Sequence, residues 1–282
     1  MLFRSWYAVP ISTDGIRMST VLKYPGAKWG IADWVISFFP KHHSYLEPFF
    51  GSGGVFFNKC RSNIETINDL DGEVVNLFEC IRDDPQKLAH YVYFTPYSLE
   101  VYNRAYSPNL PEDRFEQAAR LLVRCNMGHG FRTTGERVGW KRDVAGRERA
   151  YAAKAWCDLP EIIVDTAERL RGVQIECTSA EKLIPRFNSP DVLIYCDPPY
   201  ILRTRHGKQY RCEMTEEDHL RLLDVLKKHR GPALISGYPS EMYDSELRGW
   251  HRETTLTTDQ LSQVKTEVLW MNFEPMGQMT LY

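Results

Sequence analysis

Four consecutive residues, Asp197-Pro198-Pro199-Tyr200, bring together groups that could bind an amine on a planar ring. The Asp197 carboxylate and the Pro198 carbonyl are both hydrogen-bond acceptors. Two acceptors held in a stiff loop match the two hydrogens of an exocyclic –NH2 group. The Tyr200 side chain could stack on the ring that carries this amine. A surface turn would use the same residues, so the surrounding sequence must decide between a site and a turn.

The residues before Asp197 predict a buried strand that ends at this segment. Residues 192–195 are Val, Leu, Ile and Tyr, which suit a strand that is covered on both faces. Pro198 and Pro199 lack backbone N–H groups and therefore cannot continue the strand. Because ligands of open α/β sheets bind at the carboxyl ends of the strands, we expect Asp197 to stand at a binding edge.

Strand and helix patterns alternate on either side of a long helical stretch. Strands are expected at 44–48, 65–68, 173–177, 191–195 and 232–236, with a closing antiparallel pair at 250–256 and 267–273. Helices between these strands are expected at 31–39, 55–60, 71–82, 180–185 and 219–229. Only helices are expected between residues 85 and 171, at 85–91, 99–106, 111–124 and 150–171.

This pattern predicts an α/β domain with a mainly helical insertion. Residues 18–84 and 172–282 would form the α/β domain, and residues 85–171 the insertion. Residues 1–17 are aperiodic, so we expect them to be a disordered lead that folding does not require.

Two further segments could approach a nucleotide-like ligand. Residues 47–54, Glu-Pro-Phe-Phe-Gly-Ser-Gly-Gly, predict a strand, a glycine-rich turn and a helix, an arrangement that brings backbone close to such a ligand. The glycine spacing matches neither a dinucleotide nor a triphosphate motif. Asp69, at the end of the second strand, is placed to bind ribose hydroxyls. Both Asp69 and Asp71 could instead be helix caps, and we expect Asp71 to be one.

The composition is that of a soluble globular protein. Of 282 residues, 43% are hydrophobic and 26% charged. The net charge of -2 argues against a uniformly basic nucleic-acid binder but allows a local basic face. Seven cysteines without a Cys-x-x-Cys pair predict reduced thiols and no metal site. The sequence shows neither a membrane-span pattern nor a signal-peptide core, so we expect a cytoplasmic protein.

The order of four motifs resembles the DNA adenine methylase (Dam-type) family, including its phage- and prophage-type members. These motifs are Lys-Tyr-Pro-Gly-Ala-Lys at 23–28, Glu-Pro-Phe-Phe-Gly-Ser-Gly-Gly at 47–54, Asn-Asp-Leu-Asp at 68–71 and Asp-Pro-Pro-Tyr at 197–200. The resemblance spans roughly residues 20–275. It implies a Rossmann-like S-adenosylmethionine-dependent methyltransferase sheet, with a target-recognition domain at the insertion. It also implies methylation of the adenine 6-amino group in double-stranded DNA, with S-adenosylhomocysteine as the product.

The resemblance assigns site residues position by position. The catalytic set is Asp197, Pro198, Pro199 and Tyr200, and the cofactor-binding set is Tyr24, Lys28, Phe49, Gly51, Gly53, Asp69 and Asp197. Two positions depart from the family pattern. Ala27 stands where a glycine is common, and Ser179 where many members have an Asp that would contact the cofactor's adenine. Both departures bear on cofactor affinity.

Positive charge is concentrated in two segments. Seven Lys or Arg against three acids lie between Arg124 and Arg149, and residues 201–211 hold four basic residues and no acid. Solvated loops would show the same pattern, but we expect the two segments to form two walls of a DNA cleft. The candidate DNA-binding residues are Arg124, Arg132, Arg137, Lys141, Arg142, Arg203, Arg205 and Lys208. Arg132 and Arg137 are the candidates for reading guanine edges.

The expected mechanism is direct methyl transfer to an adenine flipped out of the duplex, without a covalent enzyme intermediate or a metal. The alternatives are a methyltransferase acting on the cytosine 4-amino group, an RNA base or a protein glutamine, and a non-catalytic DNA-binding relic. The helical insertion and the basic segments favour DNA over protein, and the intact Asp-Pro-Pro-Tyr argues against a relic. The sequence reveals neither a recognition site nor a partner restriction endonuclease.

Overall fold

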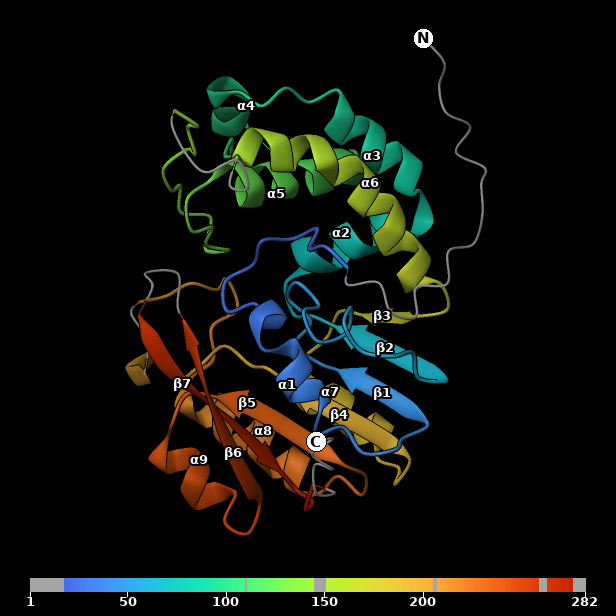
Figure 1. The fold of residues 1–282 in the computed structure, drawn as a ribbon, viewed down its shortest axis with the longest axis vertical. Coiled ribbons are helices and arrows are strands. Elements are labelled where there is room, and N and C mark those ends of the chain that lie inside the picture. Colours follow the sequence, from blue (N-terminus) through green and yellow to red (C-terminus); the bar gives the residue numbers. More distant parts are fainter. Residues whose placement is uncertain (1–17, 110, 145–150, 205–206, 259–262, 276–282) are drawn as a thin grey trace, which may run out of the picture.

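The computed structural model contains one seven-stranded sheet, in the order β3-β2-β1-β4-β5-β7-β6. The structure describes residues 18–109, 111–144, 151–204, 207–258 and 263–275. The strands are β1 (Ser44–Glu47), β2 (Ile64–Asn68), β3 (Gln174–Glu176), β4 (Val192–Cys196), β5 (Ala233–Gly237), β6 (His251–Thr258) and β7 (Val264–Met271). The first five run parallel, whereas β7 is antiparallel to β5 and to β6. The Rossmann-like sheet with a reversed strand is therefore confirmed (Figure 1).

The helices fall into those that cover the sheet and those of the insertion. The first group is α1 (Ala32–Ile36), α2 (Gly72–Asp83), α7 (Ala180–Leu183), α8 (Glu216–Lys227) and α9 (Glu241–Glu246). The second group is α3 (Pro85–Tyr93), α4 (Leu99–Arg104), α5 (Arg114–Met127) and α6 (Ala152–Leu170). Short 3-10 turns cover Lys28–Gly30, Ile184–Phe187 and Leu202–Thr204. Asp71 caps α2 as predicted, by accepting a 3.0 Å hydrogen bond from the Glu73 N–H.

The prediction of a helix at 55–60 is wrong. The chain makes a single helical turn there, in which the Phe57 and Lys59 N–H groups donate to the Gly53 and Val55 carbonyls at 2.9 and 3.1 Å. The Lys59 ammonium then folds back onto the Cys60 carbonyl at 2.8 Å, which satisfies that carbonyl outside a helix.

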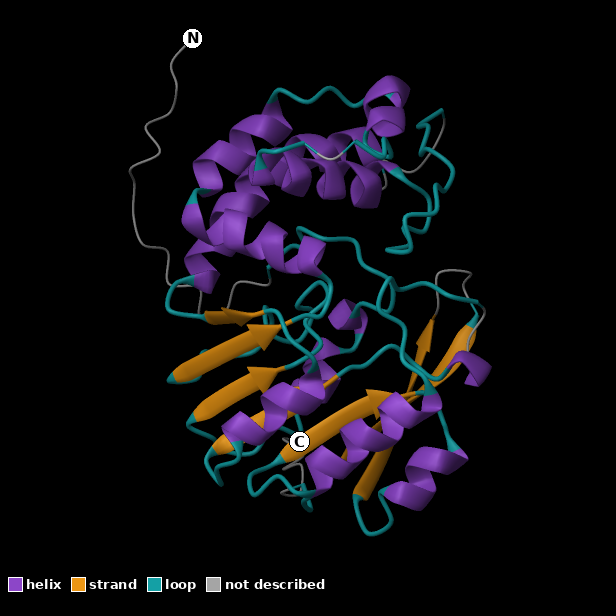
Figure 2. Cartoon of the chain, turned by 180° about the vertical axis from the view of Figure 1, so that it is seen from behind, coloured by secondary structure: helices purple, strands orange, loops and turns teal. Residues whose placement is uncertain are grey.

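Alternating side chains of the strands divide the interior into two cores. Tyr45, Leu193 and Tyr195 face the core that holds residues of α1 and α2. Their neighbours Leu46 and Ile194 face the core that holds residues of α7, α8 and α9. In Figure 2, seen from behind, α8 and α9 lie in front of the sheet. Both faces of β4 and β5 are thus covered, as the apolar sequence of β4 predicted for that strand.

The insertion shares a core with the α1 and α2 face of the sheet. Leu88 of α3, Leu122 of α5 and Ile163 of α6 are fully buried in the same cluster as Phe78 of α2 and Tyr195 of β4. Figure 1 shows α3–α6 above the sheet, with α2 between the two layers. The apolar interior is therefore continuous from the sheet into the insertion, and the boundaries at 84 and 172 stay a prediction.

Three expectations from the sequence concern the lead segment, membrane spans and metal sites. The lead at residues 1–17 lies outside the described residues. Within them, no helix combines the length and apolar character needed to span a membrane. Likewise, the described His, Cys, Asp and Glu side chains form no group of three that could hold a metal ion.

A buried ionic cluster joins the last helix of the insertion to the sheet. Glu65 of β2 accepts hydrogen bonds from Lys59 at 2.6 Å and from Arg169 of α6 at 2.9 Å, and all three residues are at most 6% exposed. The Arg169 guanidinium also lies 3.8 Å from the centre of the Phe56 ring. Removing one member of such a cluster leaves charge in a poorly solvated interior.

We expect Arg169→Ala to lower the free energy of unfolding by about 3 kcal/mol, because Glu65 would then have one cation in place of two. Urea denaturation measures this change. Arg171→Ala is the matched control, since its side chain is 77% exposed and pairs with the exposed Glu168. That control should change the free energy by less than about 0.5 kcal/mol. Equal effects of the two substitutions would contradict a stabilising role for the cluster.

Candidate functional site

The candidate site lies at the edge of the sheet where the parallel strands end. Strand β1 lies between β2 and β4, so the residues that follow these three strands meet there. A cavity of about 260 Å³ opens at this edge. Its lining includes the turn at 47–54, Asp69, Asp197 and the loop at 210–214.

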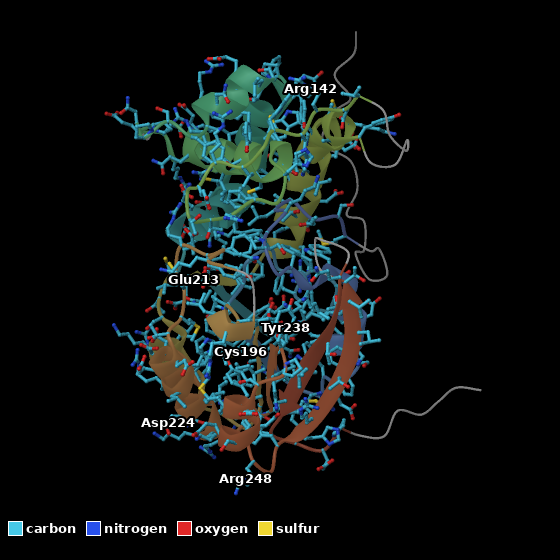
Figure 3. The ribbon with its side chains drawn as sticks, turned by 90° about the vertical axis from the view of Figure 1, so that its left-hand side faces the viewer. Arg142, Cys196, Glu213, Asp224, Tyr238 and Arg248 are labelled. Atoms are coloured by element: carbon cyan, nitrogen blue, oxygen red, sulfur yellow. The ribbon has the colours of Figure 1, made fainter. Side chains whose placement is uncertain are left out.

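The site is central in the molecule. In Figure 3, Cys196 at the end of β4 and Tyr238 just after β5 lie near each other in the middle of the view. Glu213 lies above them, on the side of the insertion, whereas Arg142 is far away at the top. The site is therefore placed between the sheet and the helical insertion.

Asp69 is held by backbone donors on both of its oxygens. The Gly51 N–H donates to Oδ2 at 2.8 Å and the Asp71 N–H donates to Oδ1 at 2.9 Å. Gly51 has a φ of 51°, and a Cβ there would lie 3.1 Å from the Tyr24 ring, so only glycine suits this turn. Burial raises the pKa of Asp69 to about 6, because the charged form loses hydration.

The aromatic residues assigned to the cofactor lie at the cavity, but one glycine does not. Tyr24 and Phe49 line the cavity together with Gly51. Gly53 has a φ of 67°, and a Cβ there would lie 2.5 Å from the Phe50 ring. We therefore interpret Gly53 as a residue that lets the turn pack rather than as a contact to a ligand.

Ser179 and Ala27 both line the cavity. The Ser179 hydroxyl is buried and has no hydrogen-bond partner among the described residues. A bound polar ligand would satisfy such a group. Ala27 has a φ of -55°, so its methyl group causes no backbone strain. The positive φ of this turn, 69°, falls on Gly26.

Asp197 receives two donors on one oxygen. The Ser236 hydroxyl donates to Oδ1 at 2.8 Å, and the Lys28 ammonium lies 3.0 Å from the same atom. Both side-chain donors found among the described residues thus bind Oδ1, so Oδ2 can accept a hydrogen bond from a ligand. Pro198 is buried in the protein, whereas Pro199 faces the cavity.

Tyr200 is anchored at its hydroxyl, which donates a hydrogen bond to Glu267 of β7. Its ring meets the Tyr238 ring edge to face, with centres 4.7 Å apart. Burial, followed by the nearby Asp197 and Glu267 carboxylates, raises the pKa of Tyr200 well above its usual range. Glu267 was not identified from the sequence, because it belongs to none of the four motifs.

Glu47 is a second carboxyl group that sequence reasoning missed. It ends β1, lines the cavity and accepts a 2.6 Å hydrogen bond from the Tyr45 hydroxyl. Burial raises its pKa to about 8. The signal was present, since Glu47 precedes Pro48 at the end of a strand just as Asp197 precedes Pro198.

The loop at 207–214 covers the cavity and is tied to the insertion. Its residues Tyr210, Cys212, Glu213 and Met214 line the cavity. The Thr133 N–H of the insertion donates to the Gln209 carbonyl at 3.0 Å. The Arg211 N–H donates to the Thr133 hydroxyl at 2.6 Å. Near α2, the Arg211 guanidinium pairs with Asp71 and Glu73.

Two of the basic residues predicted to bind DNA point inward instead. Arg124 is 9% exposed and pairs with Glu73 at 2.7 Å, because its position on α5 faces α2. This burial favours a structural role for Arg124, and its contact with DNA stays a prediction. Lys141 is half-buried, and its ammonium lies 3.3 Å from the Asn126 carbonyl. Burial and then the nearby Lys23 lower its pKa to about 8.

The remaining basic residues that the structure describes are exposed: Arg132, Arg137, Arg142, Arg203 and Lys208. Arg132 pairs with Glu136 at 2.6 Å, and Arg203 pairs with Glu216 at 2.9 Å. Both pairs lie at the surface, where such contacts are weak and can be exchanged for a phosphate. Arg205 lies outside the described residues.

The arrangement suits transfer of a group to an amine on an aromatic ring. One cavity combines an acidic residue and a glycine turn after β1 and β2 with the Asp197 carboxylate after β4, and Tyr200 lies three residues further along the same segment. The first pair is suited to a ribose-bearing ligand, and the second to an amine acceptor.

The comparisons with known proteins agree with this chemistry. A family model described as D12 class N6 adenine-specific DNA methyltransferase matches residues 24–266. The DNA adenine methylase of Salmonella typhi is 26% identical over 243 residues, which cover 82% of this chain and 83% of that protein. The DNA adenine methylase of Escherichia coli (strain K12) is 25% identical over 247 residues, or 83% and 84% of the two chains. The type II methyltransferase M1.LlaDCHI of Lactococcus lactis subsp. cremoris is 26% identical over 234 residues, or 77% and 79%. The chain therefore belongs to the family of D12 class N6 adenine-specific DNA methyltransferases.

Proposed function

We propose that the protein methylates the 6-amino group of an adenine flipped out of double-stranded DNA, with S-adenosylmethionine as the methyl donor. One observation carries this proposal: the cavity that holds Asp69 and Gly51 also holds Asp197. A ribose-bearing donor and an amine acceptor could therefore meet in it without any movement of the sheet. The alternatives of cytosine, RNA and protein glutamine gain nothing from the family, which is adenine-specific.

S-Adenosylmethionine fits the polar groups around the cavity. Asp69 would accept hydrogen bonds from the ribose hydroxyls, and the unpartnered Ser179 hydroxyl would bind the adenine moiety. Glu47, buried at the cavity wall, would face the cationic methionine end. When bound, the cofactor supplies an electrophilic methyl group. The chain's own residues fix its position and exclude water.

The amine acceptor would be held by the Asp-Pro-Pro-Tyr segment. Asp197 Oδ2 and the Pro198 carbonyl would each accept one hydrogen from the target amine. Both acceptors would favour a pyramidal nitrogen with its lone pair exposed. Because Ser236 and Lys28 hold Oδ1, the carboxylate cannot rotate without losing two donors. Catalysis would then come from positioning and electrostatics.

The target base must leave the duplex, since its amine is otherwise paired and stacked. The exposed basic residues on the insertion, Arg132, Arg137 and Arg142, and those after the catalytic segment, Arg203 and Lys208, are our candidates for holding the DNA. Arg205 remains a candidate from the sequence alone.

The catalytic role of Asp197 can be tested by Asp197→Ala. Losing one hydrogen bond that strengthens in the transition state costs about 3 kcal/mol, or a few hundred-fold in rate. We expect kcat to fall by at least that factor, while S-adenosylhomocysteine still binds measurably by calorimetry. Asp191→Ala is the matched control, because Asp191 is exposed at the opposite end of β4. Near-normal turnover of the Asp197 variant would exclude the assignment.

Cofactor binding should depend on pH through Asp69, whose pKa is raised to about 6. Both oxygens already accept backbone N–H groups, and protonation would remove the negative charge and turn one acceptor site into a donor, so the carboxyl would bind ribose hydroxyls less well. Lowering the pH from 7.5 to 5 protonates about nine-tenths of the group, and affinity for S-adenosylhomocysteine should fall about tenfold.

The Glu47→Gln variant separates this effect from that of Glu47, whose pKa of about 8 places its titration higher. The variant should keep the loss of affinity between pH 7.5 and 5. An affinity of the wild type that stays constant over this range would argue against a role for ionised Asp69.

The two basic segments should act differently on DNA. Replacing Arg203 and Lys208 by Ala should weaken binding to all sequences and flatten the log–log salt dependence by about 0.9 per lost phosphate contact. Arg132→Ala should instead reduce discrimination by about 1–3 kcal/mol at one base position. Titrations of specific and scrambled duplexes at several salt concentrations measure both effects.

Arg230→Ala is the control for charge alone. Arg230 is exposed but precedes β5, at the edge of the sheet opposite the cavity. It should leave affinity and salt dependence unchanged. If the Arg203 and Lys208 variant behaved like this control, the second segment would have no part in DNA binding.

A further inference from the structure

Glu267 is a buried carboxylate that neither the four motifs nor the proposed function uses. It lies on β7 and is 2% exposed. Burial raises its pKa, while the Lys28 ammonium acts in the opposite direction. Placing a charge in such a position is costly unless it is paired and hydrogen-bonded. The residues that pair with this carboxylate therefore indicate which part of the structure it positions.

Both partners belong to the catalytic edge. The Tyr200 hydroxyl donates to Glu267 Oε1, and the Lys28 ammonium lies 3.6 Å from the same oxygen. Glu267 thus joins the two residues that flank Asp197 in space, one on the catalytic segment and one on the Lys-Tyr-Pro-Gly-Ala-Lys motif.

Lys28 is held by three acceptors. Its ammonium donates to the Gly26 carbonyl at 2.7 Å and lies 3.0 Å from Asp197 and 3.6 Å from Glu267. The last distance is that of an ion pair rather than of a hydrogen bond. Lys28 therefore lies beside the catalytic groups, and since it also lines the cavity, the contact with the cofactor that the resemblance implied stays a prediction.

The Lys28 ammonium also lies over the Tyr200 ring, 4.7 Å from its centre. A cation on one face of an aromatic ring occupies that face and draws electron density toward it. A base that stacks on Tyr200 must then use the opposite face. The position of Lys28, which Glu267 helps to fix, therefore decides on which face of the Tyr200 ring a base can stack.

We propose that Glu267 is a positioning residue for methyl transfer: its carboxylate orients the Tyr200 ring and the Lys28 ammonium, and so sets the surface on which the target adenine stacks. This inference rests on the proposed function. A purely structural Glu267 would neutralise Lys28 and stabilise the fold, but it would leave turnover by the folded enzyme unchanged.

Three variants test the proposal: Glu267→Gln, Tyr200→Phe and the double variant. The substrate is a duplex that carries the methylated sequence found by single-molecule sequencing of expression-host DNA. Glu267→Gln removes the charge at constant size, and Tyr200→Phe removes the hydroxyl but keeps the ring. Misplacement of a reacting group by about 1 Å can cost a hundredfold in rate. We expect each single variant to lower kcat about tenfold or more, with the dissociation constant for S-adenosylhomocysteine changed less than twofold.

The double variant should lose little more than either single variant, because both changes act on the same hydrogen bond: Gln weakens it by removing the charge of the acceptor, and Phe removes its donor. Multiplied losses would show that Glu267 does not act through the Tyr200 hydroxyl and would overturn the proposal. So would wild-type kcat in Glu267→Gln or in Tyr200→Phe. The Tyr200→Phe variant keeps the Glu267–Lys28 pair, so it decides the question even if Glu267→Gln fails to fold.

Glu253→Gln is the matched control, since it makes the same chemical change on the neighbouring strand β6. Its side chain is 40% exposed and pairs with His251, away from Tyr200. It should change neither kcat nor cofactor binding. Failure of the proposed function would look different, because the wild-type protein itself would then leave adenine in its DNA unmethylated.

Discussion

The buried ammonium of Lys28 is the charge on which the catalytic edge depends. Desolvation alone would lower its pKa, but the Asp197 and Glu267 carboxylates outweigh that effect and raise it, so the group stays charged. The carboxylates in turn need the cation: burial and the nearby Asp197 raise the pKa of Glu267, and Lys28 opposes both effects. Without Lys28, Glu267 would take up a proton more readily. The same ammonium lies 3.0 Å from Asp197 Oδ1 and holds that carboxylate in place, so the ion pairs support the site as well as the fold.

A second set of ion pairs links this edge to the insertion. Arg211, in the loop that covers the cavity, and Arg124, on α5, both bind Glu73 of α2. Thr133 adds hydrogen bonds between the insertion and the same loop. Since the insertion also shares a core with the sheet, a shift of the insertion would strain the cover of the cavity. The insertion, the loop that covers the cavity and the sheet are thus parts of one packed body.

Much of the fold could be predicted because local patterns decide it. The strand at 192–196 is apolar throughout and is followed closely by two prolines, so its bounds were right to within one residue. The helix expected at 219–229 exists but begins three residues earlier, at Glu216, directly after the Thr215 and Asp218 capping box. The helix expected at 55–60 failed because Lys59 turns back into the buried cluster with Glu65, a contact that no local pattern reveals. The burial of Arg124 could not be predicted for a related reason. Its residue type suggests a DNA contact, but its place on α5 faces Glu73, and only the packing of two helices determines that.

Glu267 shows why some site residues are missed when a sequence is searched for motifs, and how such residues could be found. In a parallel sheet, the residues that follow the strands form the binding edge, which is why the motifs after β1, β2 and β4 could be recognised. Strand β7 runs in the opposite direction, and its pairing with β5 sets Val268 opposite Gly237 at the end of β5. The residues at the start of β7 therefore reach the same edge that other strands reach at their ends. A polar residue early in a reversed strand is thus as strong a candidate as one late in a parallel strand. Glu267 precedes four consecutive buried residues of β7, so it could have been singled out once the reversed strand was expected.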